Sequence, residues 1–113
     1  MADHITISEA SGTWVVRASG AVLGESSAAL ELVEGDMPAV IYFPREDIGM
    51  SFLEQTQTST TCPHKGTATY FTVTGPDGDA VDAAWSYETP LEAVKEIAGH
   101  IAFYSDRVAV EKL

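Results

Sequence analysis

The sequence predicts a mainly β protein that folds as a single domain over residues 1–113. Short segments rich in β-branched and aromatic residues alternate with turns rich in Gly, Pro, Asp and Ser, which is typical of an antiparallel barrel or sandwich. One segment alone, residues 90–98, carries helix signals. A chain of this length can bury roughly two-thirds of its unfolded surface in one core, whereas two half-sized domains would each have too little.

The first half of the chain contains several apolar segments that predict strands. Residues 13–19 (TWVVRAS) read as one strand, and residues 21–26 and 28–35 are expected to form a second pair that meets at a polar break. Residues 39–44 (AVIYFP) form a compact apolar strand. It should end at Pro44, because proline has no backbone N–H with which to continue a ladder.

Residues 67–87 predict the clearest hairpin, since two alternating runs flank the turn sequence GPDG. With the turn centred on Asp77, Val73 would face Val81. The apolar face would then carry Phe71, Val73, Val81, Ala83, Trp85 and Tyr87, while Asp82, Ser86 and Glu88 would point the other way, to solvent or a rim. A slip of one residue would reverse this sorting.

The helix expected over residues 90–98 has signals at both ends. Thr89 can serve as the N-cap, and Glu92 completes a capping box. Its apolar stripe would be Leu91, Val94 and Ile97. Residues 101–104 and 107–113 then predict two closing strands.

Composition and charge exclude several classes of partner. Seventeen acidic and six basic residues give a net charge of −11, which repels nucleic-acid backbones and anionic lipids. No apolar run approaches the roughly 20 residues needed to cross a bilayer. The N-terminal sequence has neither region of a secretory signal, so we expect a cytoplasmic protein. An open β fold leaves strand edges for self-association, so a monomer and a homodimer both remain open.

Residues 62–65 (CPHK) place the only cysteine beside a histidine and a lysine. Zinc usually requires three or four ligands in paired spacing, and the other histidines are distant in sequence, so we predict no metal site. No glycine-rich phosphate motif points to a cofactor either. A thiolate stabilised by Lys65 would make Cys62 a candidate nucleophile. The alternative is a buried, inert cysteine.

Residues 42–47 (YFPRED) place charged side chains directly after a predicted strand. The planar fork of Arg45 can clamp a carboxylate or phosphate, and Asp47 can act as a base. The alternative is a structural role, in which Arg45 pairs with a carboxylate and Asp47 caps the following turn. The sequence leaves both roles open.

The hairpin register brings the 62–65 turn within reach of Trp85 and Tyr87. We therefore expect a cleft in which Arg45 and Lys65 hold an anionic group of a small ligand between aromatic walls. The expected ligand-binding residues are Tyr42, Arg45, Lys65, Trp85, Tyr87 and Tyr104, with Asp47 and Cys62 as catalytic candidates if a reaction takes place. Whether the protein is an enzyme stays open. The alternative is an interaction or structural module in which these polar residues pair internally.

Three stretches of the chain carry a resemblance to a known family: residues 42–47, 62–71 (CPHKGTATYF) and 83–104 (AAWSYETPLEAVKEIAGHIAFY). Together they resemble the domain-of-unknown-function 427 family, whose members are sometimes catalogued as nucleotidyltransferases. The resemblance covers about residues 14–110. It implies a β-tent-like packing of short antiparallel sheets with one short helix. The family pattern maps onto Pro44, Arg45, Asp47, Cys62, Pro63, Lys65, Gly66, Trp85, Tyr87, Pro90, Phe103 and Tyr104. The nucleotidyltransferase label fits poorly, because the sequence shows neither paired carboxylates for Mg²⁺ nor a phosphate-binding loop.

Overall fold

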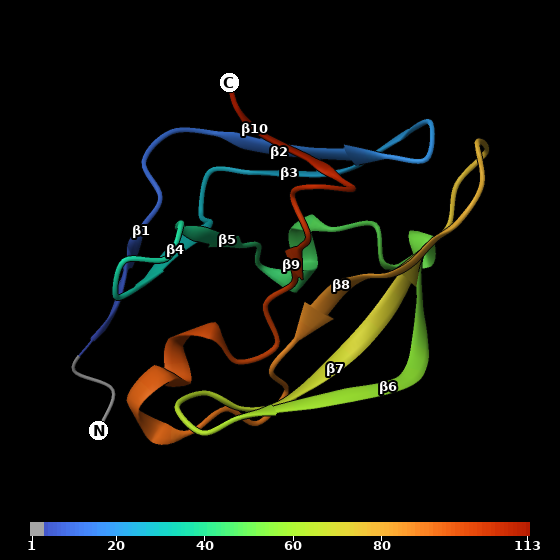
Figure 1. Cartoon of the computed structure of the whole chain (residues 1–113). Helices are drawn as coiled ribbons and strands as arrows, with labels where there is room; N and C mark the ends of the chain where they lie inside the picture. The colour runs from blue at the N-terminus through green and yellow to red at the C-terminus, as the bar shows by residue number, and fades with distance from the viewer. Residues whose placement is uncertain (1–3) are drawn as a thin grey trace.

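The computed structural model of the chain describes residues 4–113, and strands dominate it, as the sequence predicts (Figure 1). Residues 1–3 of the predicted domain lie outside the described residues. Within the described range the strands are β1 (Ile5–Glu9), β2 (Trp14–Ala18), β3 (Ala21–Ser26), β4 (Leu30–Glu34), β5 (Val40–Tyr42), β6 (Leu53–Cys62), β7 (Gly66–Val73), β8 (Ala80–Ser86), β9 (Ala102–Phe103) and β10 (Ala109–Lys112). The same range holds the short 3-10 turns η1 (Arg45–Asp47), η2 (Met50–Phe52) and η3 (Glu92–Ile97). No helix among these residues is long and apolar enough to span a membrane.

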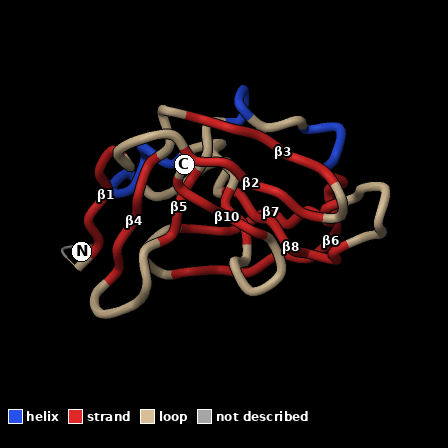
Figure 2. Tube along the Cα trace, turned by 90° about the horizontal axis from the view of Figure 1, so that it is seen from above, coloured by secondary structure: helices blue, strands red, loops and turns tan. Residues whose placement is uncertain are grey.

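The described strands form short antiparallel sheets that pack on one another. The first sheet has the order β1-β4-β5, the second β10-β2-β3 and the third β6-β7-β8-β9. In Figure 1 the second sheet lies above the third, and the first lies at the left. Seen from above, β2 and β10 overlie β7 and β8, while β1 and β4 stand to one side (Figure 2). The predicted packing of short antiparallel sheets is therefore confirmed.

Two clusters of buried apolar side chains hold these sheets together. The larger cluster joins the second and third sheets and consists of Val16, Leu23, Phe43, Ile48, Phe71, Val73, Ala83, Ala84, Ile101, Phe103 and Val108. The smaller one joins the first sheet, the third sheet and η3, and consists of Leu32, Tyr42, Ala68, Tyr70, Tyr87, Val94, Ile97 and Ala102. Phe43 and Ile101 exchange two backbone hydrogen bonds of 2.8 Å, which connect the end of β5 to the segment before β9.

The β7–β8 hairpin differs from its predicted register. Val73 pairs with Ala80 rather than with Val81, and farther from the turn the ladder shifts by two residues of β8, so that Phe71 pairs with Ala84. The shift accompanies a bulge at Asp82, whose φ is +54° and whose carboxylate accepts hydrogen bonds from two threonine hydroxyls of β6. Val81 is 62% exposed and Ser86 is fully buried. The predicted burial of Val81 and exposure of Ser86 are therefore wrong, although Ser86 does lie on the face opposite Trp85.

The expected helix over residues 90–98 is shorter and tighter than predicted. The segment forms η3, two 3-10 turns that meet at Val94, whose φ of −127° is not helical. Leu91 takes the N-cap position without a side-chain capping bond, and its side chain is exposed. Val94 and Ile97 are buried as expected. A 3-10 helix has three residues per turn, so residues three apart point in the same direction. This form therefore lets Val94 and Ile97 be buried together.

The pairing of the first strands also differs from expectation. β3 pairs with β2, whereas β4 pairs with β1 and β5, so the segments predicted as partners at 21–26 and 28–35 lie in different sheets. The polar break between them is a crossing from the second sheet to the first and not a hairpin turn. β1 and β6 are strands that the sequence did not predict.

Candidate functional site

A cavity of about 540 Å³ opens between the first sheet, the β4–β5 loop and the segment around β8 and β9. This volume lies within the range typical of small-molecule sites. Its aromatic lining, among the described residues, is Trp14, Tyr42, Tyr70, Trp85, Tyr87, Phe103 and Tyr104. Its charged lining in the same range is Glu31, Glu34 and Lys65. The structure thus gathers five of the expected ligand-binding residues here, namely Tyr42, Lys65, Trp85, Tyr87 and Tyr104.

The pairing of strands in the third sheet explains why these rings meet. Tyr70 on β7 lies directly opposite Trp85 on β8, which in turn lies opposite Ala102 on β9. Directly paired residues project from the same face of a sheet, and so do residues two positions farther along. Tyr87 and Tyr104 follow Trp85 and Ala102 at that spacing.

Contacts between the rings fix the aromatic wall. The Trp85 Nε1–H donates to the Tyr42 hydroxyl at 3.3 Å, and the two rings stand perpendicular with centroids 6.3 Å apart. The Trp85 and Tyr104 centroids are 4.6 Å apart, with the rings inclined by 46°. The hydroxyls of Tyr70 and Tyr104 share a hydrogen bond of 3.2 Å. Each ring is therefore positioned by at least one neighbour.

An ion pair forms the polar end of the cavity. The Lys65 ammonium donates to Glu34 Oε1 at 2.6 Å, and the lysine side chain is only 12% exposed. Burial alone would lower the pKa of Lys65, but the hydrogen bond to Glu34 and the negative charge of that carboxylate help to raise the pKa overall. The hydrogen bond from Lys65 lowers the pKa of Glu34. Both partners are therefore charged at neutral pH.

The tyrosine hydroxyls of the cavity remain protonated well above neutral pH. Burial raises the pKa of Tyr42 and of Tyr104 to about 12 in each case, and it also raises the pKa of Tyr87. General acid–base catalysis works best when a group titrates near the working pH. These shifts move the hydroxyls away from it, so they act as neutral hydrogen-bonding groups.

Arg45 lies outside the cavity lining and is tied to other parts of the chain. Its Nε–H donates to the Gly99 carbonyl at 3.0 Å, and an Nη–H approaches the Ser86 hydroxyl at 3.4 Å. The guanidinium also forms an ion pair with Glu88 and lies 5.9 Å from the Phe71 ring centroid. These contacts match the structural alternative from the sequence.

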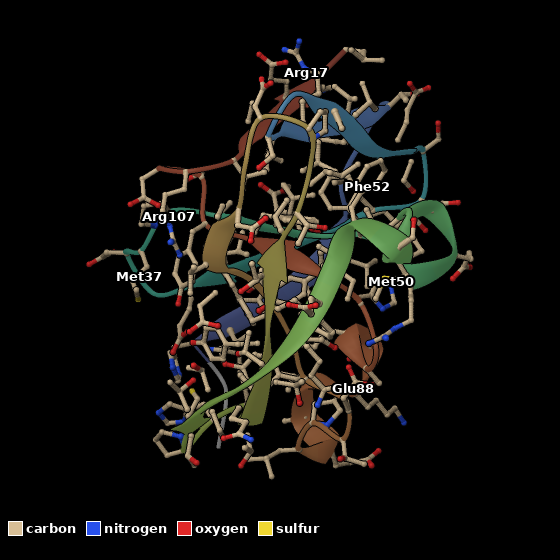
Figure 3. The ribbon with its side chains drawn as sticks, turned by 90° about the vertical axis from the view of Figure 1, so that its right-hand side faces the viewer. Arg17, Met37, Met50, Phe52, Glu88 and Arg107 are labelled. Atoms are coloured by element: carbon tan, nitrogen blue, oxygen red, sulfur yellow. The ribbon has the colours of Figure 1, made fainter. Side chains whose placement is uncertain are left out.

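Strand alternation separates Arg45 from the aromatic wall. Its partner Ser86 follows Trp85 directly in β8, and consecutive residues of a strand point to opposite faces. In Figure 3, Glu88, the ion-pair partner of Arg45, and the cavity residue Met37 lie on different sides of the ribbon. Arg45 and Lys65 therefore do not face one another across the cavity.

The two catalytic candidates also lie outside the lining. Asp47 is partly buried in η1 and accepts a hydrogen bond of 2.7 Å from the Ser26 hydroxyl. Cys62 is a free cysteine, partly buried at the end of β6 and opposite Gly66. Among residues 4–113 no group of three or more His, Cys, Asp and Glu side chains is arranged to hold a metal ion.

Several cavity residues were not singled out from the sequence. Glu34 and Lys65 are 31 residues apart and come from different sheets, so no local pattern connects them. Glu31 and the exposed loop at 37–39 line the cavity because the first sheet packs against the third. Tyr70 was also missed, because it faces Trp85 only in the observed hairpin register and would face Ala84 in the predicted one.

Comparison with known proteins gives one positive result. A search of curated proteins finds no match to the chain. The model of a protein family described as "Domain of unknown function (DUF427)" matches residues 6–112, a span that includes every element lining the cavity. The chain therefore belongs to the DUF427 family, in agreement with the resemblance of its three sequence stretches.

Proposed function

We propose that the protein binds a small molecule in the aromatic cavity. The observation that supports this most strongly is the cavity itself, with about 540 Å³ of space, aromatic walls and a single charged pair at one end. Ligand sites are usually concave and mostly apolar, with a few polar groups that orient the ligand. The Lys65–Glu34 pair, the Glu31 carboxylate and the tyrosine hydroxyls are the polar groups here.

The proposed role is binding without covalent chemistry by the residues of the cavity. Asp47 and Cys62, the reactive candidates, are not part of its lining. The pKa of Lys65 and those of the lining tyrosines Tyr42, Tyr87 and Tyr104 move away from neutrality. A carrier or sensor of a small molecule needs neither a nucleophile nor a proton shuttle.

Recognition of an anion by Arg45 and Lys65 together gains no support from these positions. Arg45 pairs with Glu88 on the other side of β8, and an anion would have to displace Glu34 to reach Lys65. The proposed site therefore does not depend on Arg45.

An interaction module without a ligand remains the second candidate, because internal pairing of Arg45 and Lys65 is what it predicts. Such a module should also expose an apolar patch. Of the large apolar side chains that are exposed, Met37 and Tyr104 line the cavity, whereas Val22, Val81, Leu91 and Leu113 come from separate elements. The cavity is thus the better supported site.

A thermal-shift screen with a charge-balanced library of small molecules tests the proposal. A ligand at 100 times its Kd stabilises the native state by about 2.7 kcal/mol. That gain raises the Tm of a domain of this size by roughly 10 °C. The Ala39→Trp variant places a large ring on the exposed loop that lines the cavity, and we expect it to abolish the shift.

The matched control is Ala93→Trp, which adds the same ring to an exposed position of η3 outside the cavity lining. The control should keep the shift. The proposal fails if no compound stabilises the wild type, or if hits stabilise the wild type and Ala39→Trp equally.

A further inference from the structure

We propose that the cavity selects small organic cations, such as methylated ammonium compounds, over uncharged and anionic molecules of the same shape. This inference rests on the proposed small-molecule site and names the chemical class of its ligand. Aromatic rings, an unpaired carboxylate and the net charge of the chain support it independently.

The rings provide the first argument. The face of an aromatic ring is electron-rich and attracts a cation within about 6 Å of its centroid, most strongly for tryptophan. Trp85 and Tyr104 are inclined by 46°, and Tyr42 stands at 90° to Trp85. These three residues all line the cavity and contact one another at different inclinations, and sets of such rings form the aromatic cages that hold quaternary ammonium groups.

One ring of the wall already contacts a cation of the protein. The Arg107 guanidinium lies 5.6 Å from the centroid of Tyr104. Hydrogen bonds of 2.6 and 3.0 Å to the carbonyls of Val81 and Asp82 keep the guanidinium there. Figure 3 shows Arg107 on the same side of the ribbon as the cavity residue Met37. Since the Arg107 guanidinium already lies against the Tyr104 ring, the binding of a cationic ligand should depend chiefly on the Trp85 ring.

The charges of the lining provide the second argument. Lys65 and Glu34 neutralise one another at 2.6 Å. Glu31, which is partly buried, has no ion-pair partner among residues 4–113, so the described lining has a net charge of −1. The whole chain has a net charge of −11. A negative potential over a cleft concentrates cations and repels anions.

Three isosteric probes separate charge from shape. Choline carries a trimethylammonium group, 3,3-dimethylbutan-1-ol replaces its nitrogen by carbon, and 3,3-dimethylbutanoate carries a negative charge. Each is titrated into the wild-type protein at constant ionic strength, and the indole N–H signal of Trp85 is followed by ¹H–¹⁵N NMR. We expect choline to shift this signal saturably and to bind about tenfold more tightly than the uncharged isostere. The carboxylate should bind most weakly.

An isosteric variant tests the contribution of the unpaired carboxylate. Glu31→Gln should weaken choline binding about threefold and reduce the preference for choline over the carboxylate probe. Glu54→Gln removes an exposed carboxylate of β6 outside the cavity lining, and it should leave both affinities unchanged. Native-like dispersion of the NMR spectrum establishes that each variant is folded.

Equal affinities for choline and its uncharged isostere would overturn the inference and leave the small-molecule site intact. An unchanged Trp85 signal with choline would overturn it as well. The broader proposal is decided separately, because the thermal-shift library contains uncharged and anionic compounds. A library without any hit would remove both proposals.

Discussion

At the scale of single residues, Arg45 shows how a charged side chain can organise the fold. Its guanidinium joins η1 to the backbone after η3 and to the end of β8, through Gly99, Ser86 and Glu88. The Ser86 hydroxyl is fully buried and donates to Glu88 at 2.5 Å, so the arginine also completes a buried polar network. A planar fork that reaches several acceptors at once is specific to arginine.

Replacing Arg45 by methionine should therefore reduce stability without affecting the cavity. We expect Arg45→Met to lower the free energy of unfolding by about 1–3 kcal/mol, because the Gly99 carbonyl and Glu88 lose their donor. Arg17→Met is the control, since the Arg17–Glu111 pair is about half exposed on both sides and contributes about 0–1 kcal/mol. Urea denaturation and ligand affinity are measured for both. If Arg45→Met lost ligand binding at unchanged stability, Arg45 would be part of the binding site and its structural role would be contradicted.

At the scale of elements, the sequence predicts most clearly those strands that have apolar periodicity. It misses β6, because this edge strand is almost entirely Thr, Ser, Gln and Glu, with no apolar alternation to mark a buried face. It misplaces the hairpin register, because the bulge at Asp82 needs a positive φ that is uncommon outside glycine. Such a conformation is selected by the threonine hydroxyls of a neighbouring strand and not by local propensity.

The same distinction applies to the candidate site. Lys65, Trp85 and Tyr87 were expected to be neighbours because one hairpin carries them, and all three line the cavity. The partnership of Glu34 with Lys65 depends on how the first sheet packs on the third, which no local pattern encodes. Arg45 lies on the other face of β8 because its partner Ser86 directly follows Trp85 in that strand.

The η3 segment should depend on burial and not on helix propensity. Ile97→Ala should lower the free energy of unfolding by about 2–5 kcal/mol, because its side chain is fully buried in the smaller core cluster. Leu91→Ala should cost less than about 0.5 kcal/mol, because Leu91 is 47% exposed. Chemical denaturation measures both. Similar losses for the two variants would favour the amphipathic helix predicted from the sequence.

At the scale of the whole molecule, two tyrosines of the lining connect the cavity to alkaline stability. Tyr42 and Tyr104 each titrate near pH 12 in the native state, above the ordinary tyrosine pKa of 10.0. Between these values the native state keeps protons that the unfolded chain has lost. Their stabilising contribution is therefore complete below about pH 10 and decreases as the pH rises toward 12.

The free energy of unfolding should accordingly fall between about pH 10 and pH 12. Tyr42→Phe removes one of the titrating groups, so its stability curve should be shallower in this window by up to about 1.4 kcal/mol per pH unit. Urea denaturation at a series of alkaline pH values measures both slopes. Parallel curves for the wild type and the variant would show that Tyr42 is not held protonated by the fold.

A crystal structure of the protein with the strongest hit from the thermal-shift screen tests the cavity as the ligand site most directly. The account predicts ligand density between Trp85 and Tyr104, next to the Lys65–Glu34 pair, with the Arg45–Glu88 pair intact. Ligand density at Arg45 or at Cys62, with an empty aromatic cavity, would contradict it.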